Sequence, residues 1–346
     1  MRLVLAVPGD LSAPTGGYAY DRALLGHLPA LGIAATHLAL PSGFPDPTPD
    51  DLAGTAARLA AVPRDAALLV DGLAYGALPP EIVRAAGRPV SALVHHPLGY
   101  ETGLSPARAA ALVAGERAAL GLAARVIATS RFTARMLASE FGVPPERIAV
   151  AEPGTPPAPR VVPRPGPHVR LLAVGTVSPR KGYDVLVRAL SALTDLDWSL
   201  TIAGSLARAP DAVAALRGRI TAAGLGERVA LAGAVTADAL ERLYAQADLA
   251  VSASLFEGYG MALTEALARG LPLVATTGGA AAETVPAGAG RAVPPGDAAA
   301  LAAALRDLIA DPECRAEAAA ASWAAGQRLP DWPATAAAVA AALRTS

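Results

Sequence analysis

The chain starts the same pattern twice, on either side of a proline-rich break. The segments MRLVLAVPGDLS at 1–12 and VRLLAVGTVSPRKG at 169–182 are each an apolar, strand-like run followed by a glycine and a polar turn. Between them, residues 152–167 hold seven prolines in sixteen positions, which excludes a helix or a central strand. We therefore expect an N-terminal domain over 1–152, a linker over 153–167, a C-terminal domain over 168–329 and a closing helix over 330–346.

Within each half, apolar runs alternate with helical segments. This alternation predicts an α/β fold with two doubly wound parallel sheets of the Rossmann-like kind. A chain of 346 residues is long enough for two such domains, and an aromatic content of only 4% with much Ala favours helices on parallel sheets. The predicted strands cover 2–7, 33–39, 67–70, 90–94, 125–128 and 148–151, then 169–174, 198–203, 229–232, 249–253, 273–275 and 291–293.

Charge and cysteine content exclude several classes of partner. The net charge of −1 argues against nucleic acid and gives no support for membrane association. No apolar run approaches the ~20 residues that span a bilayer, and the first run is too short for a secretory signal. Cys314 is the only cysteine, which excludes an internal disulfide, so we expect a cytoplasmic protein. No His, Cys and carboxylate group has metal-ligand spacing, and Asp195-Leu196-Asp197 is interpreted as a turn, so no metal or other cofactor is expected.

Lys181 is the only lysine among 29 basic residues. A lysine that persists where arginine fills every other basic position indicates a need for a compact ammonium on a flexible stem. It follows a predicted strand, next to Arg180 and Gly182. An arginine fork and a lysine point charge at such a turn suit a phosphate group.

The stretch LFEGYGMALTEALARG, at 255–270, is the most informative part of the sequence. Gly258 and Gly260 let the backbone approach a ligand, and the helix predicted over 260–268 presents a positive N-terminus. Glu257 lies in the loop, and Glu265 lies in the helix where it can accept hydrogen bonds from a diol such as ribose. The alternative is that both glutamates are ordinary solvated acids.

This stretch resembles the E-x7-E element of the retaining family-4 glycosyltransferases, which have the GT-B fold. The segments RVIATSRFTARMLASEFGVPPERIAVAEPGT and ERLYAQADLAVSASLFEGYG resemble that family's first-domain end and its approach to the two glutamates, so the resemblance covers nearly the whole chain. It implies two Rossmann-like domains facing a cleft and a last helix that packs back on the first. It also implies metal-independent, retaining transfer of a sugar from a UDP- or GDP-sugar. One departure is Thr176, where many relatives carry Arg after the strand-ending glycine.

The resemblance implies a donor site made mainly by the C-terminal domain. Arg180 and Lys181 would meet the diphosphate, Glu257 with the backbone after it the sugar hydroxyls, and Glu265 the ribose. The implied catalytic residues are His95, His96, Arg180, Lys181 and Glu257. The implied donor-binding residues are Gly16, Gly17, Arg180, Lys181, Gly233, Val235, Glu257, Gly258, Tyr259, Gly260, Met261, Leu263 and Glu265.

The N-terminal domain is expected to bring the acceptor, which is a small molecule, a glycan or a lipid-linked molecule. His95 and His96 end a strand on the edge where open α/β sheets place ligands, and either histidine can be the one that faces the reaction. A helix N-cap is an equally good account of Ser130. The acceptor contacts that we expect are Asp71, Tyr100, Glu101, Ser130 and Arg131.

Other functions on the same fold remain open. They are a nucleotide-sugar epimerase or hydrolase, a pyridoxal-phosphate-dependent phosphorylase with Lys181 as Schiff base, and a non-catalytic nucleotide-sugar-binding protein.

Overall fold

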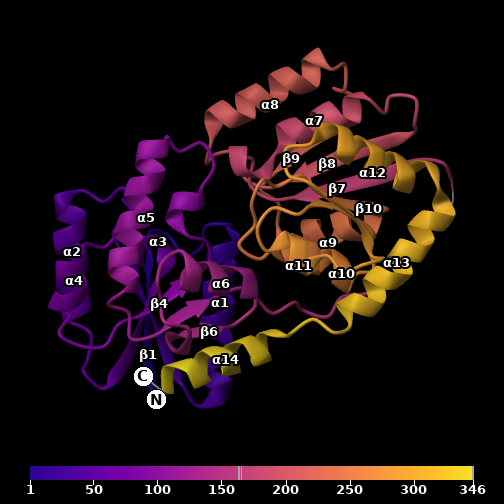
Figure 1. Ribbon diagram of the computed structural model, residues 1–346. Coiled ribbons are helices and arrows are strands. Elements are labelled where there is room, and N and C mark those ends of the chain that lie inside the picture. The colour runs from indigo at the N-terminus through magenta and orange to yellow at the C-terminus, as the bar shows by residue number, and fades with distance from the viewer. Residues whose placement is uncertain (163, 165, 345–346) are drawn as a thin grey trace. The chain divides into compact units, whose positions relative to one another are not determined.

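The computed structural model describes residues 1–162, 164 and 166–344 and contains two compact units (Figure 1). Unit 1 is Met1–Gly154 with Pro330–Ser346, and unit 2 is Thr155–Leu329. Pro163 and Pro165 of the predicted linker, and Thr345 and Ser346 of the predicted closing helix, lie outside the described residues.

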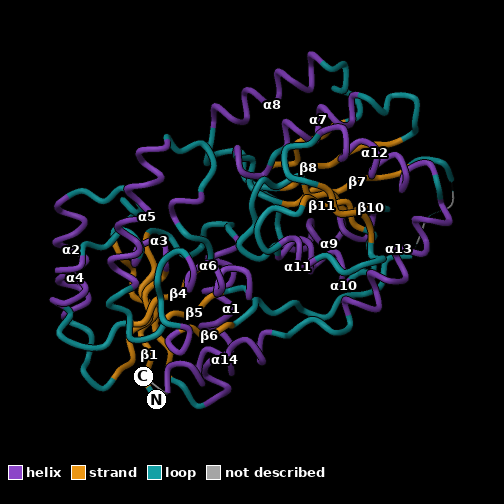
Figure 2. The backbone as a smooth tube through the Cα atoms, in the orientation of Figure 1, coloured by secondary structure: helices purple, strands orange, loops and turns teal. Residues whose placement is uncertain are grey.

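Unit 1 is built on a parallel six-stranded sheet of order β2-β1-β3-β4-β5-β6. Figure 2 shows these strands with helices around them. The strands are β1 Arg2–Pro8, β2 Ala34–Leu40, β3 Ala66–Asp71, β4 Ser91–Val94, β5 Val126–Ala128 and β6 Ile148–Val150. The helices are α1 Gly16–His27, α2 Pro49–Ala60, α3 Gly72–Tyr75, α4 Pro80–Ala85, α5 Pro106–Leu120, α6 Arg131–Ser139 and α14 Trp332–Arg344.

The last helix, α14, completes the core of unit 1. Its fully buried Val339 packs in one hydrophobic cluster with Leu24 and Leu28 from the segment that follows β1. Thr335 Oγ1 donates a hydrogen bond to the carbonyl of Glu152, 2.7 Å away, which ties the start of the helix to the end of the first half. The expected closing helix that packs on the first domain is therefore confirmed.

Unit 2 has a second parallel six-stranded sheet, of order β12-β11-β10-β7-β8-β9. Its strands are β7 Val169–Val174, β8 Trp198–Ala203, β9 Val229–Gly233, β10 Leu249–Ser252, β11 Leu273–Thr276 and β12 Gly290–Val293. Its helices are α7 Tyr183–Ser191, α8 Pro210–Ala222, α9 Ala237–Gln246, α10 Met261–Ala268, α11 Ala281–Thr284, α12 Ala298–Ala310 and α13 Pro312–Gly326. Both sheets confirm the predicted α/β class.

The strand order fixes where each sheet can bind a ligand. In unit 2, β7 has two neighbours in the sheet. The strand that follows it in sequence, β8, lies on one side, and β10 lies on the other. The loops after β7 and β10 therefore border the point where the strand order reverses, which is the usual ligand site of such sheets. In unit 1, the equivalent point lies between β1 and β3. The loops of unit 2 contain Arg180, Lys181 and Glu257, which the sequence singled out, whereas His95 and His96 of unit 1 follow β4.

The structure differs from the sequence predictions mainly at element boundaries. The strand predicted over 33–39 is observed at Ala34–Leu40. The first helix begins at Gly16, because the Thr15 side chain accepts a hydrogen bond from the amide of Tyr18 and caps the helix. It ends at His27, and Leu28–Leu31 is a 3-10 turn with a proline in its first positions.

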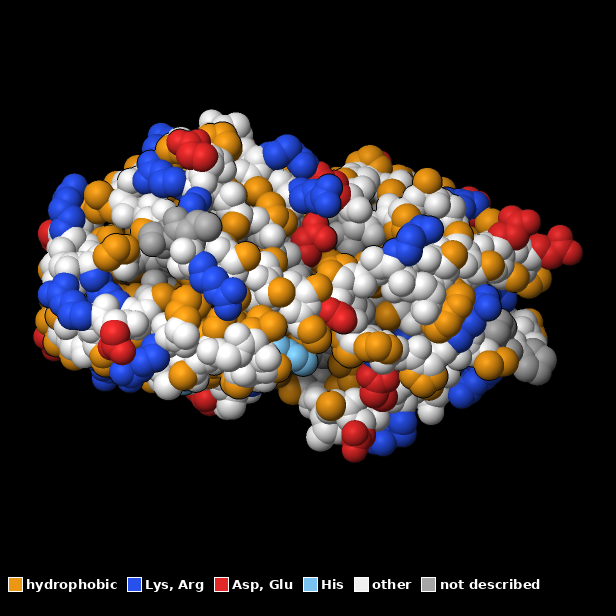
Figure 3. All heavy atoms as spheres, turned by 90° about the horizontal axis from the view of Figure 1, so that it is seen from below, with side chains coloured by type: hydrophobic (Ala, Val, Ile, Leu, Met, Phe, Trp, Pro, Cys, Tyr) orange, Lys and Arg blue, Asp and Glu red, His pale blue; other side chains and the backbone are white. Residues whose placement is uncertain are grey.

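The described residues contain no helix with the length and apolar character needed to cross a bilayer. On the face drawn in Figure 3, basic and acidic side chains are interspersed and no single sign of charge dominates.

Candidate functional site

The turn that carries Arg180 and Lys181 is seated on the loop after β10. Pro179–Lys181 forms a 3-10 turn that ends at Gly182, whose φ is 60°. A Cβ atom at Gly182 would lie 2.1 Å from the carbonyl oxygen of Ala253, so only glycine lets the two backbones approach this closely. The amide of Leu255 donates to the carbonyl of Arg180 at 2.7 Å. The two loops at the reversal point of the sheet therefore form one structure.

Glu257 is held at the centre of this structure. Its side chain is 9% exposed, and its Oε1 accepts hydrogen bonds from Lys181 Nζ at 2.6 Å and from Ser254 Oγ at 2.5 Å. Arg180 Nη1 lies 3.4 Å from Oε2. The main chain is fixed too, because the amide of Glu257 donates to Gly278 and its carbonyl accepts from the amide of Ala280.

This arrangement makes Glu257 an anion at any physiological pH. Burial alone would raise the pKa of its carboxyl group, but the charges of Lys181 and Arg180 and the hydrogen bonds from Lys181 and Ser254 lower the pKa to about 2. Two cations and one anion leave this group with a net charge of +1. Both cationic side chains are partly exposed, at 22% for Arg180 and 16% for Lys181. The group can therefore bind an anionic ligand such as a diphosphate.

Glu265 lies on α10, the helix that follows this loop. The helix begins after Gly260, whose φ is 99°, and the predicted range is confirmed to within one residue. Glu265 is partly exposed, and its Oε2 accepts a hydrogen bond from the hydroxyl of Tyr244 at 2.7 Å. Burial raises the pKa of its carboxyl group above the ordinary value, and the hydrogen bond from Tyr244 opposes that rise.

The other predicted donor-binding residues of unit 2 differ in how much of each residue is exposed. Leu263 is 3% exposed, and its side chain packs in the core, which leaves only its backbone for contact with a ligand. Tyr259 is 9% exposed, and its carbonyl accepts from Thr284. Gly233 ends β9 with a φ of 70°, and Val235 packs against the core beside it. Gly258 and Met261 are partly exposed.

In unit 1, the structure brings His95 together with two buried carboxylates. Its Nε2 lies 3.4 Å from Oδ1 of Asp21 and 3.3 Å from Oδ2 of Asp71. The ring meets Tyr20 edge-on, with centroids 5.1 Å apart. A Cβ atom at Gly17 would lie 3.3 Å from the ring, so the glycine pair at the head of α1 also leaves room for the histidine.

The two carboxylates keep His95 protonated. Burial would lower the pKa of the imidazole, but hydrogen bonds and charge from Asp21 and Asp71 raise it well above the ordinary value. For Asp21, burial and the neighbouring Asp71 raise the pKa. The raised pKa favours the protonated form of His95, a hydrogen-bond donor, at neutral pH.

The remaining predicted residues of unit 1 are spread over several contacts. His96 Nε2 lies 3.8 Å from Glu101, and the hydroxyl of Tyr100 donates to Glu140. Ser130 is the N-cap of α6 and accepts from the amide of Thr133, which agrees with the simpler of its two interpretations. Arg131 is exposed and lies 3.6 Å from Glu152. Gly16 is exposed at the first position of α1.

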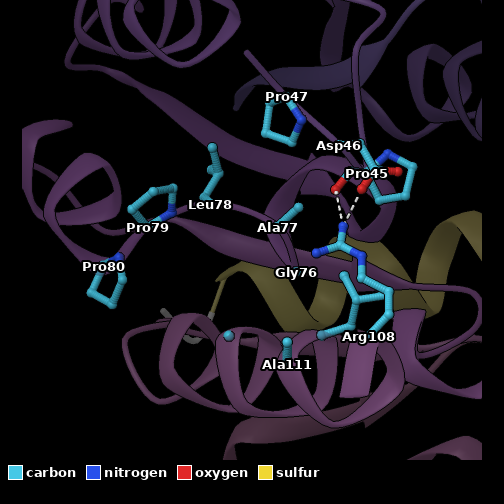
Figure 4. A pocket seen from close by; sticks show the side chains of 12 residues that line it. Pro45, Asp46, Pro47, Gly76, Ala77, Leu78, Pro79, Pro80, Arg108 and Ala111 are labelled. Atoms are coloured by element: carbon cyan, nitrogen blue, oxygen red, sulfur yellow. Dashed lines mark hydrogen bonds and ion pairs between the residues drawn. The ribbon is translucent and has the colours of Figure 1, made fainter. Parts of the chain in front are cut away.

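A shallow cavity of about 430 Å³ lies on the same edge of the unit 1 sheet (Figure 4). It is bordered by the loop after β2 and by the segment that follows α3. Four prolines and Leu78 contribute apolar walls, polar groups contribute about as much of the lining, and the ion pair of Arg108 with Asp46 lies on one side. The cavity therefore offers a mixed polar and apolar surface with one charged pair.

One group among the described residues has donor atoms close enough to hold a metal ion. It is formed by Asp21, Asp71 and His95, whose ligand atoms all lie within 4.8 Å of one another. The raised pKa of His95 works against this use, because a protonated ring nitrogen has no lone pair to offer a metal. The ion pairs of His95 with Asp21 and Asp71 explain why these three groups lie so close together.

Sequence reasoning missed three residues that hold the predicted ones in place. Asp21 had a signal, because the spacing Tyr18, Asp21, Leu24 and Leu28 puts it on the apolar face of its helix. Ser254 lies three residues before Glu257, but its hydroxyl reaches that glutamate only because the loop turns back. Tyr244 reaches Glu265 from a different helix, and no local pattern indicates that contact.

Two family models match adjoining parts of the chain. The model described as "Glycosyltransferase Family 4" matches residues 28–158, and "Glycosyl transferases group 1" matches residues 158–322. D-inositol 3-phosphate glycosyltransferase of Mycolicibacterium gilvum is 33% identical over 177 residues, which are 48% of this chain and 39% of that protein. A second such enzyme, from Catenulispora acidiphila, is 33% identical over 58% of this chain and 53% of its own length. The chain thus spans about half the length, or less, of these curated relatives.

Solved structures share the fold over nearly the whole chain. Sucrose-phosphate synthase from Thermosynechococcus elongatus has a TM-score of 0.81 at 21% identity, covering 99% of each chain. Anabaena HepE, solved with UDP and glucose, has a TM-score of 0.77 at 20% identity, covering 99% of this chain and 100% of that one. The chain has two Rossmann-like sheets, two adjoining family matches and the two spaced glutamates Glu257 and Glu265. It belongs to the family-4 glycosyltransferases of the GT-B fold.

Proposed function

We propose that this chain is a metal-independent, retaining glycosyltransferase that moves a sugar from a UDP- or GDP-sugar to a hydroxyl-bearing acceptor. The observation that carries the proposal is the cationic pair of Arg180 and Lys181 around the buried Glu257. The pair lies at the strand-order reversal of unit 2. A nucleoside diphosphate gains negative charge as the glycosidic bond breaks, and fixed cations stabilise that charge more in the transition state than in the ground state.

Each residue then has a role set by its contacts. Arg180 and Lys181 bind the diphosphate, and Glu257, fixed by main-chain and side-chain hydrogen bonds, receives the sugar hydroxyls. Glu265 binds the ribose through its carboxylate. His95 acts as a charged hydrogen-bond donor to the transferred sugar or the acceptor. Burial lowers its pKa, but Asp21 and Asp71 raise it by more. The departing phosphate then serves as the base that takes the acceptor proton, and the new bond forms on the same face.

The names of the relatives indicate which substrates to test first. HepE was solved with UDP-glucose, and the curated relatives are named for D-inositol 3-phosphate. UDP-glucose is therefore the first donor to test, with GDP-mannose beside it. Phosphorylated polyols and sugar phosphates form the first acceptor panel.

The first experiment is a thermal-shift screen of the wild-type chain against UDP, GDP, ADP and their sugars, with and without EDTA. We expect stabilisation by at least one of them that EDTA does not remove. Transfer is then assayed by mass spectrometry, and the anomeric configuration of the product by NMR. An inverted product contradicts retention, a metal-dependent rate contradicts metal independence, and a shift with none of the ligands contradicts the donor site.

Substitutions separate catalysis from simple binding. In an enzyme, Lys181→Ala lowers turnover by more than about tenfold even at saturating donor, because a transition-state contact is lost. In a non-catalytic binding protein, the same change weakens binding and the wild type shows no turnover. A pyridoxal-phosphate phosphorylase would need a free amine at Lys181 and an absorbance band near ~400 nm from the cofactor. The ion pair with Glu257 at 2.6 Å argues against a free amine.

A further inference from the structure

The carboxylate of Glu265 accepts a hydrogen bond from a buried tyrosine on another helix. Tyr244, on α9, is 1% exposed, and its hydroxyl donates to Oε2 of Glu265 at 2.7 Å. In the part of the chain that the structure describes, Oε1 of Glu265 takes part in no hydrogen bond. One carboxylate oxygen is therefore fixed and the other remains available, on a side chain that is itself partly exposed.

The tyrosine is in turn fixed by an arginine at the end of α10. The guanidinium of Arg269 lies over the Tyr244 ring, 4.4 Å from its centroid, and Arg269 is 5% exposed. Its Nη1 donates to the carbonyl of Glu265 at 2.8 Å, and its Nη2 pairs with Glu241 of α9. The ring, the guanidinium and both helices therefore form one packed group that sets the rotamer of Glu265.

A partly buried carboxylate without such support would turn among several rotamers and would often be protonated. Burial and the like charge of Glu241 raise the pKa of Glu265, and the hydrogen bond from Tyr244 and the charge of Arg269 oppose that rise and so favour the ionised form. An ionised carboxylate with one free oxygen is a strong acceptor for a vicinal diol.

We propose that Tyr244 is a positioning residue for ribose recognition: it orients Glu265 so that the free oxygen accepts hydrogen bonds from the ribose hydroxyls of the nucleotide. Arg269 supports it by holding the ring. The inference rests on the proposed nucleoside-diphosphate site and deepens it, because it names which part of the nucleotide Tyr244 controls. Tyr244 itself does not touch the ligand.

The test compares ligands that differ only in the ribose hydroxyls. Dissociation constants for UDP and 2′,3′-dideoxy-UDP, and for the matching guanosine pair, are measured by calorimetry on the full chain. Wild type should bind the ribose form about tenfold more tightly than the dideoxy form, since hydrogen bonds to a charged group are lost with the hydroxyls. Tyr244→Phe keeps the buried ring and should weaken the ribose form about tenfold while changing the dideoxy form by less than about twofold.

Two further variants complete the design. Tyr75→Phe removes a buried tyrosine hydroxyl of unit 1, whose partner is the carbonyl of Ala119 at 3.2 Å, and should leave both ligands unaffected. In the Glu265→Gln background, Tyr244→Phe should have little additional effect on UDP, because both changes act on one contact. Melting temperatures without ligand check that each variant is folded.

The outcomes separate the two proposals. Wild type that binds none of these diphosphates contradicts the donor site itself, and with it this inference. Wild type that binds UDP but does not discriminate against the dideoxy form, or Tyr244→Phe that weakens both forms equally, contradicts only the role of Tyr244. Additive effects of the two substitutions contradict action through Glu265.

Discussion

At the residue scale, the buried carboxylate of Glu257 makes a prediction about pH and stability. Burial works against its charge, but Lys181 and Arg180 lower its pKa from 4.5 to about 2. A lowered pKa means that the ion pair stabilises the folded state above pH 4.5 and that this contribution is lost as the pH falls toward 2. The shift corresponds to at most about 3.5 kcal/mol, at about 1.4 kcal/mol per pKa unit.

Urea unfolding of wild type and Glu257→Gln checks this. Wild type should be more stable at pH 6, and the difference between the two should shrink by about 2 kcal/mol between pH 6 and pH 3. Glu146→Gln removes an exposed carboxylate and serves as the control, with no comparable trend expected. A difference that stays constant with pH would show that the charge of Glu257 does not contribute in this way.

The same scale shows what the sequence could predict about the site. Lys181 and Glu257 were found because chemically distinctive residues follow apolar runs, and the parallel sheet brings such loops to one edge. Their direct contact was not predicted, since it depends on Gly182 packing against Ala253. Tyr244 and Ser254 were missed because no local sequence pattern distinguishes a hydroxyl that supports a site residue from any other hydroxyl. The role of Ser130 as N-cap could be read locally, and the structure agrees.

At the element scale, two glycines in unit 2 should respond to alanine with opposite signs. Gly182→Ala forces a φ of 60° on an alanine and a 2.1 Å contact with the Ala253 carbonyl, so it should destabilise unit 2 by about 2 kcal/mol or more. Gly218 lies exposed within α8 with open space at its Cβ position. Gly218→Ala should stabilise the unit by about 0.5–1 kcal/mol, because helical glycine has a large entropy of unfolding.

Denaturant unfolding of both variants measures these effects, and UDP binding adds a second readout. Gly182→Ala should also weaken UDP binding, since it displaces Arg180 and Lys181, whereas Gly218→Ala should leave binding unchanged. Equal stability of the Gly182 variant and wild type would contradict the close seating of the two loops. A binding defect in the Gly218 variant would contradict a donor site that excludes α8.

Elements with strong periodicity were predicted well, and short ones were not. The long apolar strands and α14 follow from runs of buried residues whose period matches their structure. Helices α3 and α4, with 4 and 6 residues, were not predicted. Such short helices have little intrinsic stability and depend on tertiary contacts and caps, as with the Asp71 side chain that accepts from Leu73. That same capping role holds Asp71 next to His95.

At the scale of the whole molecule, the two units should unfold as separable transitions with separate controls. Unit 1 needs α14, which contributes buried residues such as Val339 and Leu343 to its core. Removing residues 330–346 should therefore lower the unit 1 transition by ~10 °C or more, since each buried aliphatic side chain contributes about 1.5–3 kcal/mol. Unit 2 has its own core clusters, and among the described residues none of their members comes from α14.

Ligand linkage identifies which transition belongs to which unit. UDP at about 100 times its dissociation constant should stabilise unit 2 by about 2.7 kcal/mol and leave the unit 1 transition in place. Calorimetry of the full chain and of the truncated chain, each with and without UDP, tests both statements at once. Because truncation and UDP act on different cores, their effects should be independent. If truncation lowered the UDP-responsive transition, or UDP raised both, the two units would have to be treated as one cooperative body.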